Sequence, residues 1–140
     1  MYRSITALFG LGAVALAASA TLDAGDPSVG KQVYARCAGC HSPERDRTGP
    51  RHCGLIGRVA GSVPGFEYSA AMRESKIIWT AEMLGQFLEA PMTFLPGTNM
   101  AIAGIKDPGK RRDLIAYLED MSSSRDVCNL ELSSSLGGLQ

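Results

Sequence analysis

The sequence predicts an all-α fold in which three to five short helices are joined by long loops. Apolar residues recur at helical spacing near residues 80–90 and 107–121, and no segment shows the alternation typical of strands. Residues 42–65 carry a glycine or proline every few positions, which is too many for a helix to form. The 140 residues show no internal repeat and fit a single domain.

The first twenty residues have the pattern of a secretory signal. Arg3 begins a short positive region, residues 5–17 are largely apolar, and residues 18–20 (Ala-Ser-Ala) offer a small-x-small cleavage site. This apolar segment is shorter than the roughly 20 residues that span a bilayer. We therefore expect residues 1–20 to be cleaved on export to the periplasm. A signal retained as a membrane anchor is the alternative.

The first helix is expected after a flexible lead at residues 21–29. Asp26 or Ser28 can cap this helix, with Pro27 at its start, and we expect it to run to about Cys37.

Two helices are expected in the middle of the chain. A short one covers residues 69–74, and Thr80 caps a stronger one that ends before Pro91. Residues 91–100, with two prolines and a glycine, are expected to be loop.

Asp107 and Pro108 begin the last predicted helix, which runs to about Met121. The tail at 122–140 is rich in Ser and Gly, and we expect it to be mostly mobile apart from Cys128. So few short helices bury too little apolar area to stabilise such an irregular chain. The composition therefore predicts that another group fills the centre of the domain.

Charge excludes one class of partner. The chain has 14 basic and 14 acidic side chains, and without Arg3 the balance is 13 against 14. Nucleic-acid binding needs a basic surplus, so we expect no nucleic acid as partner.

Residues 37–41 (Cys-Ala-Gly-Cys-His) form the C-x-x-C-H pattern that attaches a haem covalently. Two thiols at this spacing on a helix end, Cys37 and Cys40, can reach both vinyl groups on one edge of a porphyrin. His41 then lies under the iron as an axial ligand. Ala38 and Gly39 are small enough to let the helix end approach the ring.

Taken without this motif, the four cysteines allow two disulfides, a zinc site or a redox pair. A thioredoxin-like redox pair expects an adjoining βαβ pattern, which is missing. A zinc site needs a second pair at metal spacing, and the adjacent His52 and Cys53 do not form one.

Seven blocks follow one another in an order that is specific to one family. They are Arg36 to His41, Thr48 to Pro50, Gly54 to Arg58, Pro64 to Ser69, Ile77 to Trp79, Pro96 to Met100 and Leu114 to Leu118. With these blocks the chain resembles the mitochondrial and short bacterial cytochromes c, the class I c-type cytochromes. The resemblance implies a cytochrome c fold at residues 30–121, wrapped around one covalent haem c, and an electron carrier rather than an enzyme.

The resemblance also implies the second axial ligand, Met100, from a loop across the haem from His41. The other candidates are Met72, Met83, Met92 and Met121. His/Met ligation closes both faces of the iron and raises its potential. A haem enzyme or a gas-binding protein, which needs an open iron position, is the less favoured alternative.

Five further positions match pocket residues of the family. Pro50 matches the proline whose carbonyl accepts a hydrogen bond from the proximal histidine. Tyr68 and Trp79 match donors to a haem propionate. Arg58 matches a cation near the propionates, and Thr98 a hydroxyl beside the methionine loop.

Several positions depart from the family pattern. Met72 and Phe87 stand where an Asn and a Tyr are familiar, and we expect this to dry the pocket. Cys53 and Cys128 are unusual, and the family's fold would place them close enough for a disulfide. His52 stands where an apolar residue is usual, and we interpret it as a packed or surface side chain rather than a ligand.

The expected partners are larger redox proteins. They are a cytochrome bc1-type complex, a terminal oxidase, a reaction centre or a periplasmic dehydrogenase, and the alternative to a general shuttle is a dedicated acceptor for one such dehydrogenase. At positions where the mitochondrial proteins have lysines, the chain retains Arg36 and Lys106 but has Met92, Thr93, Asn99 and Asp107. We expect a monomer with weak electrostatic steering.

Overall fold

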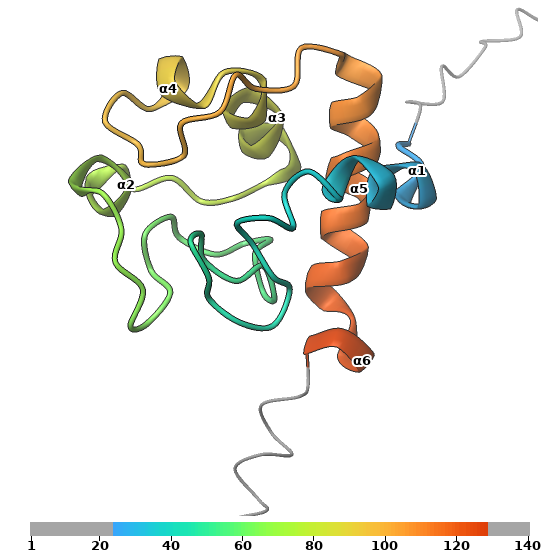
Figure 1. The fold of residues 1–140 in the computed structure, drawn as a ribbon, viewed down its shortest axis with the longest axis horizontal. Helices are drawn as coiled ribbons and strands as arrows, with labels where there is room; N and C mark the ends of the chain where they lie inside the picture. The colour runs from blue at the N-terminus through green and yellow to red at the C-terminus, as the bar shows by residue number, and fades with distance from the viewer. Residues whose placement is uncertain (1–23, 129–140) are drawn as a thin grey trace, which may run out of the picture.

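A computed structural model describes residues 24–128, and this part of the chain is helical (Figure 1). The helices are α1 (Pro27–Tyr34), α2 (Ala70–Glu74), α3 (Ala81–Glu89), α4 (Pro91–Phe94), α5 (Pro108–Ser123) and α6 (Arg125–Cys128). Between residues 24 and 128, strand-like pairing is limited to one isolated antiparallel bridge, Val59 with Ile78. The prediction of an all-α fold is confirmed. The predicted signal peptide lies outside the described residues.

Helices α1 and α5, the first helix and the last long helix of the described chain, cross at close range (Figure 1). A Cβ added at Gly30 would lie 1.9 Å from the carbonyl oxygen of Asp113, so the crossing requires glycine there. The backbone N–H of Asp26 also donates to Oδ1 of Asp113 at 2.9 Å. This crossing holds the chain that leads into Cys37 against the last long helix.

Three of the helix starts follow the caps that the sequence singled out, and Ser69 provides a fourth. Asp26 caps α1 by accepting from the N–H of Ser28, and Ser69 caps α2. Thr80 caps α3, and Asp107 caps α5. Each cap satisfies a backbone donor that lacks a partner within the first helical turn.

The structure corrects the predicted loop at 91–100, because α4 occupies its first residues. Pro91 is the first residue of α4, and the N–H of Leu95 donates to its carbonyl at 2.9 Å. Proline is favoured at the first helical position, where no N–H is needed. The proline that ends α3 therefore also begins the next turn.

Helix α1 begins at Pro27, as the predicted Asp26 cap requires, and it therefore overlaps the end of the lead expected to be flexible at residues 21–29. At the other end α5 continues to Ser123, and Arg125–Cys128 form α6. The first part of the predicted tail is thus helical, and residues 129–140 lie outside the described part.

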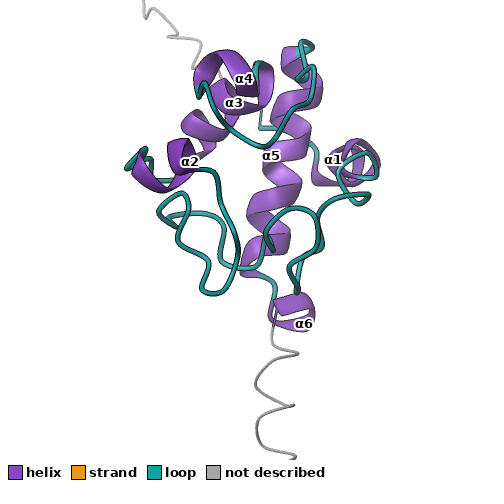
Figure 2. Cartoon of the chain, turned by 60° about the vertical axis from the view of Figure 1, so that its left-hand side comes forward, coloured by secondary structure: helices purple, strands orange, loops and turns teal. Residues whose placement is uncertain are grey.

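The core lies between α5, α3 and the loops that follow α1. Its buried members are Tyr34, Leu55, Ala60, Trp79, Leu84, Phe87, Leu88, Leu114, Ile115, Leu118 and Met121. Figure 2 shows how much of the chain between α1 and α2 is loop. No helix among residues 24–128 has the length and apolar character needed to cross a membrane.

Candidate functional site

A cavity of about 540 Å³, lined mainly by apolar side chains, lies inside this arrangement. Its volume is in the range of about 300–1,000 Å³ that is usual for ligand sites. The predicted site residues that line it are Cys37, Cys40, His41, Pro50, Arg58, Tyr68, Trp79, Thr98 and Met100. Residues from distant parts of the sequence thus converge on one space.

The two motif thiols stand on turns that continue α1. The N–H of Cys37 donates to Tyr34 O at 2.8 Å, and the N–H of Cys40 donates to Cys37 O at 3.0 Å. Both thiols are free of a disulfide. Burial, followed by the neighbouring Cys40, raises the pKa of the Cys37 thiol. These thiols are available for covalent attachment of a group in the cavity.

His41 is oriented by its own loop. Its Nδ1 donates to the carbonyl oxygen of Pro50 at 2.8 Å, so Nε2 is the ring nitrogen that can bind a metal. A Cβ added at Gly49 would lie 2.3 Å from Cε1 of His41, so the chain passes close to the ring edge. Burial lowers the pKa of His41, against an opposing contribution from the Pro50 hydrogen bond. The neutral imidazole is the form that ligates metals.

His52 lies directly against His41. The two rings stack with centroids 4.3 Å apart and planes inclined by 23°. Burial, with additional contributions from His41 and Arg58, lowers the pKa of His52 to about 3. His52 is therefore a packed side chain and neutral near neutral pH. Sequence reasoning did not anticipate this stacking, because only the fold of residues 42–52 brings the rings together.

Two methionines line the cavity, Met100 and Met72. Met100 stands in the loop after α4, where its N–H donates to Oγ1 of Thr98 at 3.2 Å. Met83 and Met121 pack in or against the core, and Met92 is 58% exposed. Among the described methionines, the structure therefore leaves Met100 and Met72 as the candidates for a ligand.

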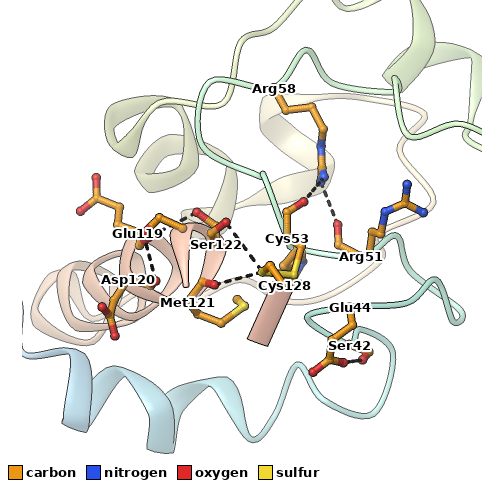
Figure 3. Close-up of a disulfide and its surroundings, with 12 residues drawn as sticks. Ser42, Glu44, Arg51, Cys53, Arg58, Glu119, Asp120, Met121, Ser122 and Cys128 are labelled. Carbon is orange, nitrogen blue, oxygen red and sulfur yellow. Dashed lines mark hydrogen bonds between the residues drawn. A yellow bond between two sulfur atoms is a disulfide. The ribbon is translucent and has the colours of Figure 1, made fainter. Parts of the chain in front are cut away.

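Arg58 lines the cavity with its guanidinium anchored to the backbone. It donates from Nη1 to Cys53 O at 2.9 Å and from Nη2 to Arg51 O at 2.8 Å (Figure 3). Burial lowers the pKa of Arg58, and the nearby Tyr68 opposes this effect. A partly buried cation held in this way can offset anionic groups in the cavity.

Two further lining residues flank helices α3 and α4 in the sequence: Trp79 precedes α3, and Thr98 follows α4. Trp79 is 7% exposed, and its ring lies 5.1 Å from that of Phe87. Thr98 is 9% exposed. Both place side chains with hydrogen-bond donors in a lining that is mainly apolar.

Outside the cavity, the structure joins Cys53 to Cys128 by a disulfide, with Cα atoms 5.4 Å apart (Figure 3). The bond links α6 to the loop that follows Pro50. Beside it, the N–H of Gly54 donates to Ser122 O at 3.0 Å, and Sγ of Cys128 lies 3.3 Å from Met121 O. The end of α5 and the loop behind His41 are thus held together by covalent and backbone contacts.

A model of the cytochrome c family matches residues 28–122. The chain therefore belongs to the cytochrome c family, within the class I c-type cytochromes. As in that family, it carries one covalently bound c-type haem, and it transfers electrons rather than acting as an enzyme. The predicted fold, cofactor and class of function are confirmed.

Among curated proteins, the chain is similar to cytochrome c 2.1 of Caenorhabditis briggsae, with 45% identity over 71% of this chain and 92% of the relative. It is also similar to cytochrome c2 of Blastochloris viridis, with 40% identity over 83% of this chain and 93% of that protein. Among solved structures, cytochrome cH from Methylobacterium extorquens is 38% identical, with a TM-score of 0.66. That match covers 68% of this chain and 98% of the other.

The residues present fit the haem that the family implies. The cavity offers two free thiols, an imidazole nitrogen and a thioether, set in apolar walls with one anchored cation. Imidazole and thioether are donors that suit the iron of a c-type haem, and the two thiols can bond covalently to its vinyl groups. The haem supplies a one-electron couple, and the chain's own residues determine how it is held and shielded.

Proposed function

We propose that the protein is a periplasmic electron carrier whose haem iron is bound axially by His41 and Met100. One observation carries this proposal: both side chains line the same cavity, and the Pro50 carbonyl holds Nδ1 of His41 so that Nε2 is the free nitrogen. Cys37 and Cys40 make the two thioether bonds. Arg58, Tyr68 and Trp79 hold the propionates, and Thr98 supports the methionine loop.

The preference for Met100 over Met72 follows from the elements that carry them. Met72 lies on helix α2, where its backbone is hydrogen-bonded to the Ser69 cap. Met100 lies in the loop between α4 and α5, and its N–H donates to Oγ1 of Thr98. A loop can place a thioether directly over a flat group, whereas a helix presents its side chain along a fixed stripe.

Export to the periplasm is supported by the sequence of residues 1–20. Disulfides persist in such an oxidising compartment, which is consistent with the pairing of Cys53 and Cys128. Mass spectrometry of protein isolated from the periplasm would give the mature N-terminus. A mature chain that still begins at Met1 would favour the membrane-anchor alternative.

Partner docking is proposed to depend mainly on apolar contact around the cavity mouth. Ile102 lines the cavity and is exposed, Met92 of α4 is exposed as well, and Lys106 directs its Nζ to the carbonyl of Glu89 at 2.8 Å. With so few cations at the mouth, association rates with redox partners should depend weakly on salt. Electron-transfer rates with an oxidase, a reaction centre and a dehydrogenase would distinguish a general shuttle from a dedicated acceptor.

The proposed ligand pair is tested by the absorption spectrum of the purified protein. An iron–thioether bond produces a weak far-red band in the oxidised state, and we expect that band together with no binding of carbon monoxide in the reduced state. Absence of the band with ready binding of carbon monoxide would show an open iron position and overturn the proposal. That result would favour the gas-binding alternative.

A further inference from the structure

His52 lies against His41, and the proposed function gives it no role. Its ring is stacked on that of His41 with centroids 4.3 Å apart. A neighbour stacked on one face limits how far the His41 ring can tilt or turn. The other restraints on His41 are the close approach of Gly49 at its edge and the Pro50 carbonyl at Nδ1.

The ring of His52 is itself oriented by α1. The Tyr34 hydroxyl forms a hydrogen bond of 3.1 Å with Nδ1 of His52, and the two rings meet edge to face at 5.7 Å. Tyr34 is 6% exposed and packs on Tyr117 of α5. The hydroxyl therefore sits on a rigid element and fixes the direction of the imidazole.

The backbone of His52 is equally restrained. Its N–H donates to Ser42 O at 3.2 Å and to Pro43 O at 3.1 Å. The next residue, Cys53, donates its N–H to Pro43 O at 2.8 Å and is bonded to Cys128. The imidazole thus cannot drift away from His41 with a moving loop.

We propose that His52 is a positioning residue for the proximal ligand, and that the Tyr34 hydroxyl directs it. The pair holds the His41 ring so that its Nδ1–H stays aligned with the Pro50 carbonyl. This inference rests on the proposed function, because it requires His41 to bind the iron.

The orientation of His41 affects the reduction potential of the haem iron. A well-aligned hydrogen bond from Nδ1–H to a carbonyl makes the imidazole a stronger electron donor at Nε2, and a stronger donor stabilises the oxidised iron. If His41 gains rotational freedom, this bond weakens on average. The reduction potential then rises, and the plane of the imidazole relative to the haem changes.

The first test is Tyr34→Phe, which removes the hydroxyl and keeps the packed ring. We expect a higher reduction potential and a changed order of the haem methyl signals in the proton NMR spectrum of the oxidised protein, since those signals report ligand-plane orientation. Tyr117→Phe is the matched control. It removes a hydroxyl from the adjoining ring and should leave both measurements unchanged.

The second test is a double-mutant cycle with His52→Leu. Leucine also removes polar atoms near the iron, so the decisive quantity is the effect of Tyr34→Phe in the His52→Leu background. We expect that effect to vanish, because the hydroxyl acts only through His52. If His52→Leu does not fold with haem, the same cycle uses His52→Phe, which keeps a ring and cannot bond to Tyr34.

Two results would overturn the inference. One is a Tyr34→Phe protein with the potential and methyl signals of the wild type; the other is an undiminished effect of Tyr34→Phe when His52 is replaced. Failure of the proposed function is separate, because it appears in the wild type as a missing far-red band. A wild type with the band and a silent Tyr34→Phe variant would remove this inference alone.

Discussion

The two sides of the haem cavity are held by different kinds of contact. The histidine side, residues 37–58, is fixed by polar and covalent contacts: the Pro50 carbonyl on His41, the backbone bonds of His52 and the disulfide of Cys53. The methionine side, residues 95–106, contains no cysteine and is held by backbone hydrogen bonds and by packing. Its loop has the Thr98–Met100 hydrogen bond and a bond from the N–H of Ile105 to Leu88 O at 2.8 Å.

The surroundings of the two proposed ligands differ in the same sense. His41 has a hydrogen-bond acceptor and a polar ring within contact distance. Met100 lines the same cavity as the apolar Met72 and Phe87, and its own N–H donates to Oγ1 of Thr98. From this difference we infer that hydrogen bonds orient His41, whereas the position of Met100 depends on the shape of its pocket and on the exclusion of water from it.

The largest effect is expected from removing the ligand on the methionine side. Met100→Leu keeps the volume of the side chain and should abolish the far-red band, lower the reduction potential and allow carbon monoxide to bind. Met72→Leu is the matched control and should retain the band. Visible spectra of both variants measure this, and loss of the band in Met72→Leu alone would reassign the ligand.

The next largest effect concerns the covalent contact of the histidine side. Replacing Cys53 and Cys128 together by serine should lower the free energy of unfolding by up to about 4 kcal/mol, because the bond closes a loop with a sequence separation of 75. Denaturant unfolding followed by haem absorption measures the loss. We expect the far-red band to survive in the native state, since Met100 lies in another loop.

Mass spectrometry of the unreduced wild type is the companion measurement for that variant. We expect no alkylation of Cys53 or Cys128 before reduction. Two alkylated thiols in the native protein would contradict the bond, and the double serine variant would then be expected to unfold like the wild type.

A smaller effect is expected at the edge of His41. In Gly49→Ala, the added Cβ would meet the imidazole ring at 2.3 Å, so ring or loop must move. Overpacking of this kind costs about 1–3 kcal/mol, and it should also perturb the haem methyl signals. Gly85→Ala in α3 is the control, because its Cβ would make an ordinary contact of 3.6 Å with Ile115.

The smallest effect tests the dryness of the methionine side. Phe87 is 4% exposed, and Phe87→Tyr or Met72→Asn introduces a polar group that stabilises the more positive oxidised haem. Both variants should lower the reduction potential. A tenfold change in the equilibrium constant between oxidised and reduced haem corresponds to about 59 mV for a one-electron couple. Potentiometric titration measures the shift. Unchanged or raised potentials in both proteins would refute the dry-pocket interpretation.

Much of the fold could be predicted because its signals are local. Asp26, Ser69, Thr80 and Asp107 each cap a helix by bonding to a backbone N–H two or three residues later. The prediction was wrong at Pro91, where the same residue type ends one helix and begins another. Proline satisfies the rules for both roles, so the local pattern alone did not resolve them.

The candidate site also contains residues that local sequence patterns place and residues that only the fold brings together. The positions of Cys37, Cys40 and His41 on the end of a helix depend on spacing within five residues, which the sequence displays directly. His52 and Tyr34 are 18 positions apart, and no periodicity predicts that their side chains meet. Their contact depends on the path of a loop rich in glycine and proline.

The sequence by itself determined the chemistry: which thiols, imidazoles and thioethers are present, and where the helices begin. The tertiary structure alone decided that His52 covers one face of His41 and that the Tyr34 hydroxyl reaches the His52 ring. The physical reason is the distance along the sequence over which each kind of interaction acts. Caps and motifs act over one helical turn, whereas stacking and cavity lining require segments brought together by the whole fold.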